Sequence, residues 1–341
     1  MYFAVPAAVT DACAVASKGE GRKAIPRLPV RVHPSLRLYP SDALVTTLDR
    51  CPLCHEDHHR HVLTCRDHTV SDETFPIVEC ENCGVRFTNP RPGDDEIGQY
   101  YESEDYTPHQ DTSHGLIDTL YRWVRVYTLW SKHRLISSLV PDPPGRLLDF
   151  GCGTGKFLDL CRSKGWAVHG LDPDAGAQEV AAQKYGLSVE DPARLRDLPA
   201  DHFDVVTLWH VLEHVPRLSA TVEHLKRTLA PTGTLVVAVP NCSSLDAQYY
   251  GEHWAAYDVP RHLYHFRPDD VRRLFARFNM TVTDIRPMRL DAFYVSLLSE
   301  QYQDGWLPRA PVVATLSLLW AAAHEHQSSA QLYLIRGSAA R

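Results

Sequence analysis

Residues 147–155 read Leu-Leu-Asp-Phe-Gly-Cys-Gly-Thr-Gly, and this stretch decides the fold class. The apolar run at its start predicts a buried strand, and glycines follow at every second position. Helical spacing then predicts a helix over residues 155–164. A glycine-rich turn between a strand and a helix lets the backbone approach a ligand closely and directs helix N-terminal amides toward it. The stretch therefore predicts a ligand-binding turn.

Two common nucleotide-binding turns do not fit this spacing. A dinucleotide fingerprint, Gly-x-Gly-x-x-Gly, needs glycine at position 156, where the chain has Lys156. A phosphate-binding loop needs glycine at 150 and Ser or Thr at 157, and both of these residues are Phe. Asp172 ends the next predicted strand, where a carboxylate can bind both hydroxyls of a ribose. The pattern favours a nucleoside that carries no phosphate.

Predicted strands and helices alternate from this turn to the C-terminus. Apolar or β-branched runs bounded by turn or charged residues predict strands at residues 146–150, 167–171, 187–189, 205–208, 234–239, 281–285 and 331–336. Helical spacing predicts helices at residues 155–164, 175–185, 220–229 and 269–278. This rhythm implies βαβ units. We therefore expect an α/β fold with a doubly wound, mostly parallel sheet of seven strands.

The glycine turn resembles motif I of class I S-adenosylmethionine (SAM) dependent methyltransferases, and the resemblance extends over residues 115–341. It implies a Rossmann-like fold with SAM as the cofactor. The residues that it implies for the methionine part of SAM are Asp149, Gly151, Gly153 and Gly155. Asp172 would bind the ribose, and Glu190 or Asp191 would flank the adenine.

The segment after the strand at 205–208 resembles the part of these enzymes that lies beside SAM. The resemblance implies that Trp209 packs near the cofactor and that His210 faces the substrate cleft. Methyltransferases that act on nucleic-acid amino groups typically carry Asn-Pro-Pro-Tyr here, and its absence counts against base methylation. For Glu213 and His214, a capping or surface position in the following helix competes with a functional role.

A long loop after the strand at 234–239 resembles a family of bacterial methyltransferases that modify small molecules, sugars and cell-surface glycans or lipids. In that family a Trp, an Asp-x-Pro-Arg-His pattern and a His-Phe pair follow the fifth strand. The matching residues here are Trp254, Asp258, Pro260, Arg261, His262, His265 and Phe266. We expect substrate contacts from this loop, and the residues predicted for them are Trp254, Tyr257, Asp258 and Arg261.

Methyl transfer to a hydroxyl or an acidic C–H group also needs a base that titrates near neutrality, and histidine is suited to this. We predict His262 as this base, with His265 as the second candidate and His210 as the third.

Two Cys-x-x-Cys pairs mark a small unit over residues 46–92. Each pair places two thiolates on a tight turn, and together they can form a tetrahedral Zn²⁺ site. The predicted ligands are Cys51, Cys54, Cys80 and Cys83, although nearby His55, His58, His59 or His61 could replace one of them. The unit is too small to fold around a core without metal, so the ion would be structural. Some sugar C-methyltransferases carry a similar ribbon before the SAM domain.

The remaining segments give the expected domain organisation. Residues 1–45 are predicted to be a tail whose basic, proline-containing stretch at 18–37 is a solvated linker or a contact to anionic lipid or RNA. Residues 93–145 form a helical connector that includes a helix over 116–139, and residues 146–341 form the SAM domain with an insertion at 287–329. The apolar run at 310–323 is too short to span a bilayer. It predicts a packing helix or dimer face, or else peripheral contact with a membrane.

The chain has 341 residues and a formal charge of −7, which argues against a nucleic-acid partner. Paired cysteines and the lack of a signal-like N-terminus favour a cytoplasmic protein, at most peripheral to the inner membrane face. We expect methyl transfer to the oxygen of a small molecule, sugar or lipid-linked glycan. The alternatives are C-methylation of a nucleotide-linked keto-sugar and a non-catalytic zinc-ribbon binding protein. The oligomeric state stays open, and a dimer is one possibility.

Overall fold

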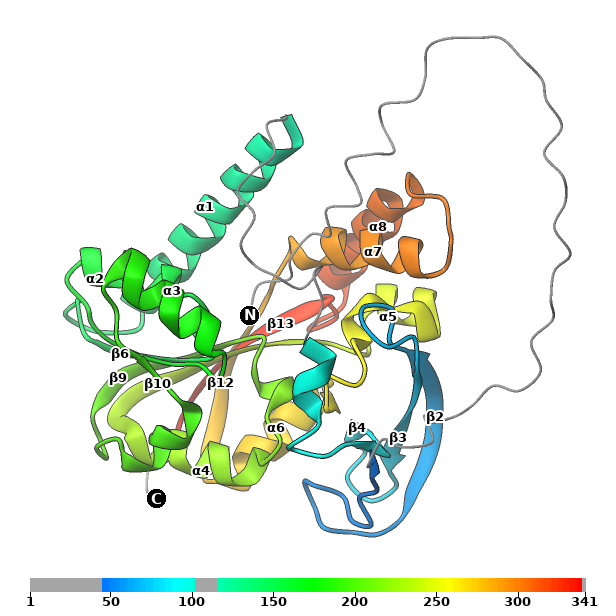
Figure 1. Cartoon of the computed structure of the whole chain (residues 1–341), viewed down its shortest axis with the longest axis horizontal. Helices are drawn as coiled ribbons and strands as arrows, with labels where there is room; N and C mark the ends of the chain where they lie inside the picture. Colours follow the sequence, from blue (N-terminus) through cyan, green and yellow to red (C-terminus); the bar gives the residue numbers. More distant parts are fainter. Residues whose placement is uncertain (1–44, 102–115, 339–341) are drawn as a thin grey trace, which may run out of the picture.

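A computed structural model of the chain describes residues 45–101 and 116–338. The predicted tail at 1–45 lies outside these ranges except for Val45, and so does part of the predicted connector. A central sheet carries helices on both of its faces, and a smaller, mostly N-terminal sheet lies beside it (Figure 1).

The central sheet has seven strands in the order β12-β13-β10-β9-β6-β7-β8. Its strands are β6 (Arg146–Phe150), β7 (Ala167–Leu171), β8 (Val189–Glu190), β9 (Phe203–Trp209), β10 (Leu229–Pro240), β12 (Met280–Pro287) and β13 (Ala330–Gly337). The five strands from β10 to β8 are parallel to their neighbours, while β13 pairs antiparallel with both β10 and β12. The predicted doubly wound sheet of seven strands is therefore confirmed.

Successive strand residues point to opposite faces of this sheet, and each face has its own apolar core. Leu147 and Val205 pack in the core that contains residues of α1, α2 and α3, whereas Leu148 and Val206 pack in the core that contains residues of α4 and α6. Figure 1 shows α2 and α3 on one side of the sheet and α4 and α6 on the other. The helix bounds are α1 (Leu116–Ser137), α2 (Lys156–Ser163), α3 (Ala175–Tyr185), α4 (Leu218–Thr228), α5 (Leu245–Tyr250) and α6 (Pro268–Ala276).

The smaller sheet joins two segments that are far apart in the sequence. Its order is β11-β4-β3-β2, with β2 (His59–Arg66), β3 (Thr74–Cys80), β4 (Arg86–Thr88) and β11 (Tyr264–His265). β11 comes from the loop after β10 and pairs antiparallel with β4. A short pair, β1 (Val45–Thr46) and β5 (Arg91–Pro92), completes the N-terminal unit. The cysteine-rich unit is thus joined by strand pairing to the loop after β10.

The predicted elements differ from the observed ones mainly at their ends. The third strand is observed at Val189–Glu190, where residues 187–189 were expected, and the fifth begins five residues earlier than expected, at Leu229. The predicted insertion at 287–329 holds two helices, α7 (Asp291–Tyr302) and α8 (Arg309–Ala323).

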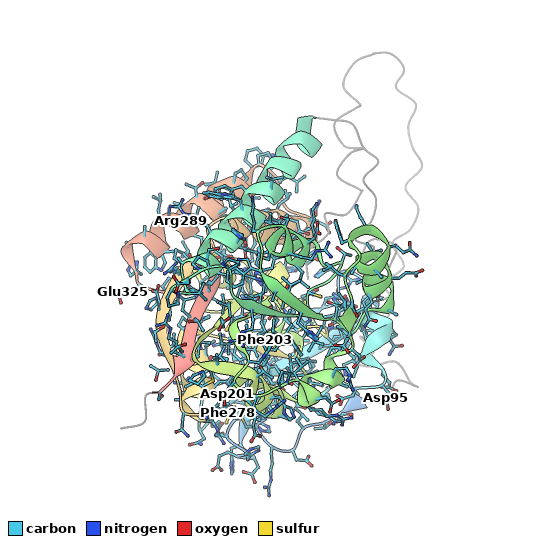
Figure 2. The ribbon with its side chains drawn as sticks, turned by 90° about the vertical axis from the view of Figure 1, so that its left-hand side faces the viewer. Asp95, Asp201, Phe203, Phe278, Arg289 and Glu325 are labelled. Carbon is cyan, nitrogen blue, oxygen red and sulfur yellow. The ribbon has the colours of Figure 1, made fainter. Side chains whose placement is uncertain are left out.

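Among the described residues, no helix combines the length and apolar character that a bilayer crossing needs. In Figure 2, Phe203 lies near the middle of the molecule, with charged residues such as Asp95 and Glu325 at its edges.

Candidate functional site

The loop from β6 to α2 lies at the carboxyl edge of the parallel strands and has the left-handed backbone that its glycines allow. The φ angles are 76° at Gly151, 54° at Gly153 and 75° at Gly155. A Cβ atom on Gly151 would collide with the side chain of Val211, so this position needs glycine for space as well as for conformation. The amides of Gly151 and Cys152 donate to the Leu171 carbonyl at 2.7 and 3.1 Å, which fastens the loop to β7.

Asp172 lies directly after β7 and faces this loop. Its carboxylate accepts hydrogen bonds from the amides of Gly153 at 2.6 Å and Asp174 at 3.0 Å. Burial raises the pKa of Asp172, and the two amide hydrogen bonds oppose that rise. A carboxylate held against an open glycine turn is the arrangement that a ribose diol requires. The residues at this edge therefore fit the nucleoside part of SAM.

Asp149 lies at the end of β6 beneath the loop. Its carboxylate is buried and accepts a hydrogen bond from the Thr207 hydroxyl at 2.6 Å. Burial raises the pKa of Asp149 to about 6, although that hydrogen bond and the charge of Lys132 lower it. Lys132 comes from α1, and its ammonium lies 4.2 Å from the centre of the Trp209 ring. Burial lowers the pKa of Lys132 to about 8, while Asp149 and Asp291 oppose that shift.

Lys132 was not among the residues predicted for the site. One signal in the sequence could have found it, because Leu129, Lys132 and Ile136 lie on the buried face of α1 at helical spacing. A lysine on an otherwise apolar face needs a partner for its charge.

Two acidic residues flank the outer side of the site, at the end of β8. Glu190 pairs with His169 at 3.0 Å, and its carbonyl accepts from the Asp172 amide at 2.9 Å. The Asp191 carboxylate caps a short 3₁₀ helix by accepting from the Ala193 amide at 2.7 Å. Glu190 therefore contacts Asp172 through its backbone, and Asp191 is the next residue in the sequence.

His210 follows β9 and carries a positive φ of 56°. Its Nε2 lies 3.0 Å from an Asp291 carboxylate oxygen, and its Nδ1 lies 3.5 Å from Glu213 Oε1. Burial by itself would lower the pKa of His210, but these two carboxylates outweigh it and raise the pKa to about 9. Asp291 begins α7, inside the predicted insertion, and no local pattern marked it as a partner of His210.

Comparison with known families agrees with this geometry. Residues 123–285 match a family that is described as a methyltransferase domain. Residues 123–285 form a class I SAM-dependent methyltransferase domain.

Curated relatives of this methyltransferase domain include two O-methyltransferases. The chain is 29% identical over 151 residues to a ubiquinone biosynthesis O-methyltransferase of Chelativorans sp. (strain BNC1), covering 41% of this chain and 60% of that protein. It is 29% identical over 160 residues to a malonyl-[acyl-carrier protein] O-methyltransferase of Serratia marcescens, covering 46% and 62% respectively. The chain thus spans less than two thirds of the length of these relatives. A solved SAM-dependent methyltransferase from Archaeoglobus fulgidus is 20% identical, with a TM-score of 0.43 and coverage of 62% and 93%.

The loop after β10 in the methyltransferase domain is largely buried. Arg261 donates to Asp258 at 2.6 Å, to Asp67 at 2.9 Å and to the Tyr100 carbonyl at 2.9 Å. These bonds tie the loop to the N-terminal unit. Trp254 and Tyr257, which were also predicted to contact substrate, are buried as well, and the Trp254 indole donates to Asp246 at 2.8 Å.

The two histidines predicted first as the base are both buried in the same loop. His265 lies in β11, and its Nε2 is 3.0 Å from the Thr88 hydroxyl. Burial holds the pKa of His265 well below its usual value, and positive neighbours act in the same direction. The ring of His262 packs edge-on against His214, with ring centres 4.5 Å apart. Of the three histidines predicted for catalysis, His210 comes directly after a parallel strand of the domain.

The four predicted cysteine ligands lie together in the N-terminal unit. The Sγ atoms of Cys51 and Cys83 are 3.6 Å apart, those of Cys54 and Cys80 are 3.4 Å apart, and all four lie within 4.8 Å of one another. Thiolates around Zn²⁺ at about 2.3 Å give sulfur–sulfur distances of about 3.8 Å. The spacing of the four sulfur atoms is therefore close to that of a tetrahedral zinc site. The nearby His55 and His58 are exposed, and the cluster of four cysteines does not include them.

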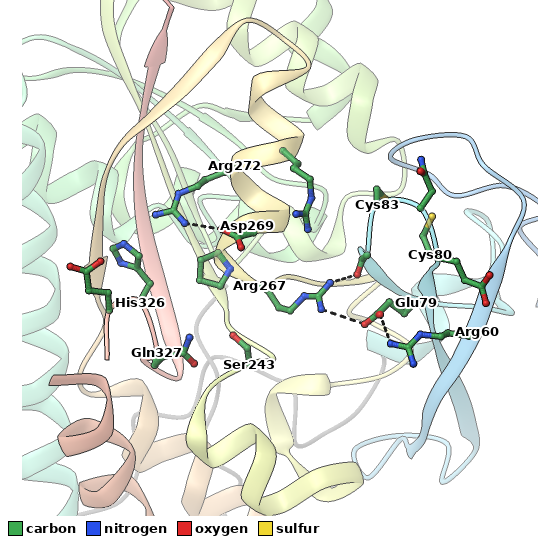
Figure 3. Close-up of a pocket in the computed structure, with 16 residues that line it drawn as sticks. Arg60, Glu79, Cys80, Cys83, Ser243, Arg267, Asp269, Arg272, His326 and Gln327 are labelled. Atoms are coloured by element: carbon green, nitrogen blue, oxygen red, sulfur yellow. Dashed lines mark hydrogen bonds and ion pairs between the residues drawn. The ribbon is translucent and has the colours of Figure 1, made fainter. Parts of the chain in front are cut away.

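A polar groove of about 790 Å³ separates this unit from α6 (Figure 3). Several of its charges are paired within the protein, since Glu79 binds both Arg60 and Arg267, and Asp269 binds Arg272. The groove borders the segments after β10 and before β13, whereas the glycine loop follows β6, two strands away. The groove is therefore separate from the proposed SAM site.

Proposed function

We propose that this protein transfers the methyl group of SAM to an oxygen atom of a small-molecule acceptor. The observation that carries the proposal is the Asp172 carboxylate held against the glycine loop at the carboxyl edge of the sheet. The curated relatives named above are O-methyltransferases, which supports oxygen as the atom that is methylated.

The site residues would bind and orient SAM from three sides. Gly151, Gly153 and Gly155 would shape the turn that holds the methionine part, and Asp172 would accept hydrogen bonds from the ribose. Lys132 is suited to the methionine carboxylate, because it brings a buried cation beside Asp149 and Trp209. Bound SAM would supply a methyl group on a sulfonium. An acceptor oxygen held in line with the carbon–sulfur bond would bond to the methyl carbon as that bond breaks and S-adenosylhomocysteine leaves.

We propose His210 as the residue that takes up the proton of the acceptor hydroxyl. It follows β9 at the same edge as the glycine loop. Because Asp291 at 3.0 Å and Glu213 at 3.5 Å raise its pKa to about 9, it would accept the proton in its neutral form, and turnover should rise as the pH approaches 9. His265 is less suited to this role, because its Nε2 already faces Thr88 within the small sheet.

Replacing His210 by glutamine should lower the turnover number by about 100-fold or more, the usual contribution of a positioned base. The assay would use methyl-labelled SAM with a panel of phenols, carboxylic acids and sugars, and would detect products by mass spectrometry. Affinity for S-adenosylhomocysteine should change little. His224→Gln on α4 is the matched control and should keep wild-type turnover. Wild-type turnover in His210→Gln would exclude this residue as the base.

We also propose that the cysteine cluster holds a structural Zn²⁺ ion. The sulfur–sulfur distances fit a tetrahedral site, and β4, which follows the second cysteine pair, pairs with β11 of the methyltransferase domain. The ion would therefore hold the substrate-side loop as well as the N-terminal unit.

We infer that the acceptor reaches the protein from a lipid surface. The outer face of α8 exposes Val312, Leu316, Leu319 and Trp320, with Leu319 63% exposed. Trp306, 66% exposed, precedes the helix, and aromatic side chains at the edge of an apolar face suit a membrane interface. The sequence before residue 45 adds a basic stretch that anionic lipid would attract.

Leu316→Asp with Leu319→Asp should abolish co-flotation of the full chain with vesicles that contain anionic lipid. The two charges would have to enter the interfacial region, where burying them is costly. The matched control carries the same charge change on the exposed face of α3, Ala182→Asp with Gln183→Asp, and should float like the wild type. If the wild type is instead a dimer by light scattering, fails to float, and becomes monomeric in the α8 variant, this face is a dimer interface.

A further inference from the structure

Three side chains that the proposed methyl transfer does not use meet beside His210. Glu213 and His214 belong to the 3₁₀ helix Leu212–His214 after β9, and His262 belongs to the loop before β11. A carboxylate oxygen of Glu213 and one ring nitrogen of each histidine lie within 4.8 Å of one another. Glu213 and His262 are each only 1% exposed. Segments 47 residues apart thus bring three potential ligands to one buried point.

Backbone carbonyls determine how both imidazole rings present their nitrogens. Nδ1 of His262 lies 2.8 Å from the Ala256 carbonyl oxygen, and Nδ1 of His214 lies 3.0 Å from the Arg261 carbonyl oxygen. A carbonyl only accepts hydrogen bonds, so Nδ1 carries the proton in each ring and Nε2 keeps a lone pair. The Tyr101 hydroxyl, also 3.0 Å from His214 Nδ1, can accept a share of the same hydrogen. Histidines that bind metals through Nε2 typically have this second contact.

The convergent atoms are hydrogen-bond acceptors. Among the described residues, His262 Nε2 and both carboxylate oxygens of Glu213 have no hydrogen-bond partner. The His210 ring approaches Glu213 at 3.5 Å, and an oxygen of Asp258, whose carboxylate also pairs with Arg261, lies 3.9 Å from His262 Nε2. Burying an ionised carboxylate and imidazole lone pairs together is costly unless a cation binds between them.

We propose that Glu213, His214 and His262 bind a divalent transition-metal ion. Two imidazoles and one carboxylate suit Zn²⁺, Co²⁺, Ni²⁺ or Fe²⁺, whereas Mg²⁺ and Ca²⁺ prefer ligand sets made of oxygen. Three protein ligands leave at least one coordination position for another donor. The ion would join the segment after β9 to the segment after β10, next to His210. This site is distinct from the cysteine cluster, which offers four sulfur ligands.

Cobalt distinguishes the two sites, because thiolate ligands give Co²⁺ intense near-ultraviolet charge-transfer bands and nitrogen and oxygen ligands give only weak visible bands. The full chain would be produced in minimal medium supplemented with Co²⁺ and analysed for cobalt content and absorption. We expect two cobalt ions per wild-type chain, and one in Glu213→Gln and in His262→Ala, with the thiolate bands unchanged. Those bands and the circular dichroism spectrum would show that the variants are folded.

His224→Ala, on α4, is the control and should keep both ions. One cobalt per wild-type chain, or a second ion that survives in both Glu213→Gln and His262→Ala, would overturn the proposal. The number of cobalt ions per chain does not depend on SAM binding. This experiment therefore tests the metal site independently of the proposed methyl transfer.

Discussion

Alanine in place of Asp172 should weaken binding of S-adenosylhomocysteine by about 100- to 10,000-fold. The Asp172 carboxylate is the proposed acceptor for both ribose hydroxyls, and hydrogen bonds to a charged group contribute about 1.5–3 kcal/mol each. Methylthioadenosine, which keeps the ribose and adenine but lacks the amino acid, should lose affinity to the same extent. Calorimetric titration of the full chain with each ligand measures both effects.

Two further variants make the Asp172 experiment decisive. Asp172 also accepts from the Gly153 and Asp174 amides, so Asp172→Asn, which keeps one acceptor oxygen, separates loss of the ligand contact from loss of the loop. We expect Asp172→Asn to bind with intermediate affinity and to melt near the wild-type temperature. Asp197→Ala removes an exposed carboxylate from the short 3₁₀ helix that follows β8 and should bind normally. Unchanged affinity in Asp172→Ala would place the ribose elsewhere.

Serine at Cys54 and Cys80 should remove the thiolate-bound metal and unfold the N-terminal unit. Structural zinc sites contribute about 10–16 kcal/mol in small zinc-finger peptides, which is as large as the stability of a typical domain. We expect the double variant to lose metal by elemental analysis, to melt at a lower temperature and to be cleaved by protease within residues 51–92.

The same double substitution should also loosen a loop of the methyltransferase domain. β11 would lose its partner β4, and Arg261 would lose Asp67, so the loop after β10 should become accessible to protease as well. Cys65→Ala, a buried cysteine of the same unit that lies outside the cluster, is the control and should keep the metal. Wild-type protein without bound metal, or a double variant that resists protease like the wild type, would contradict the zinc proposal.

The central sheet was predictable because its signals are local. The glycine turn at 147–155 joins an apolar strand to an amphipathic helix within a few residues, and the loop that results needs a positive φ at Gly151. Asp172 was found for the same reason, since it directly follows the second strand. The four cysteine ligands were predictable too, because the spacing within each Cys-x-x-Cys pair places two thiolates on one tight turn.

Contacts between distant segments could not be read from such patterns. The pairing of β11 with β4 and the Arg261–Asp67 contact join residues that are more than 170 positions apart, and no local pattern encodes either. Asp291 reaches His210 from an insertion whose composition predicts only helix. For Glu213 a cap or surface position competed with a functional role. The residue is buried, and its carbonyl accepts a hydrogen bond from the Leu263 amide in the loop that carries His262.

Hydrogen exchange measured by mass spectrometry tests the central claim, that this protein binds SAM at the carboxyl edge of the sheet, most directly. The full chain would be compared with and without saturating S-adenosylhomocysteine. Binding at this edge predicts slower exchange in peptides that cover residues 149–157 and 172–176, with no change in the cysteine unit at residues 51–83. Unchanged exchange in both of the first two segments, even at millimolar ligand, would contradict it.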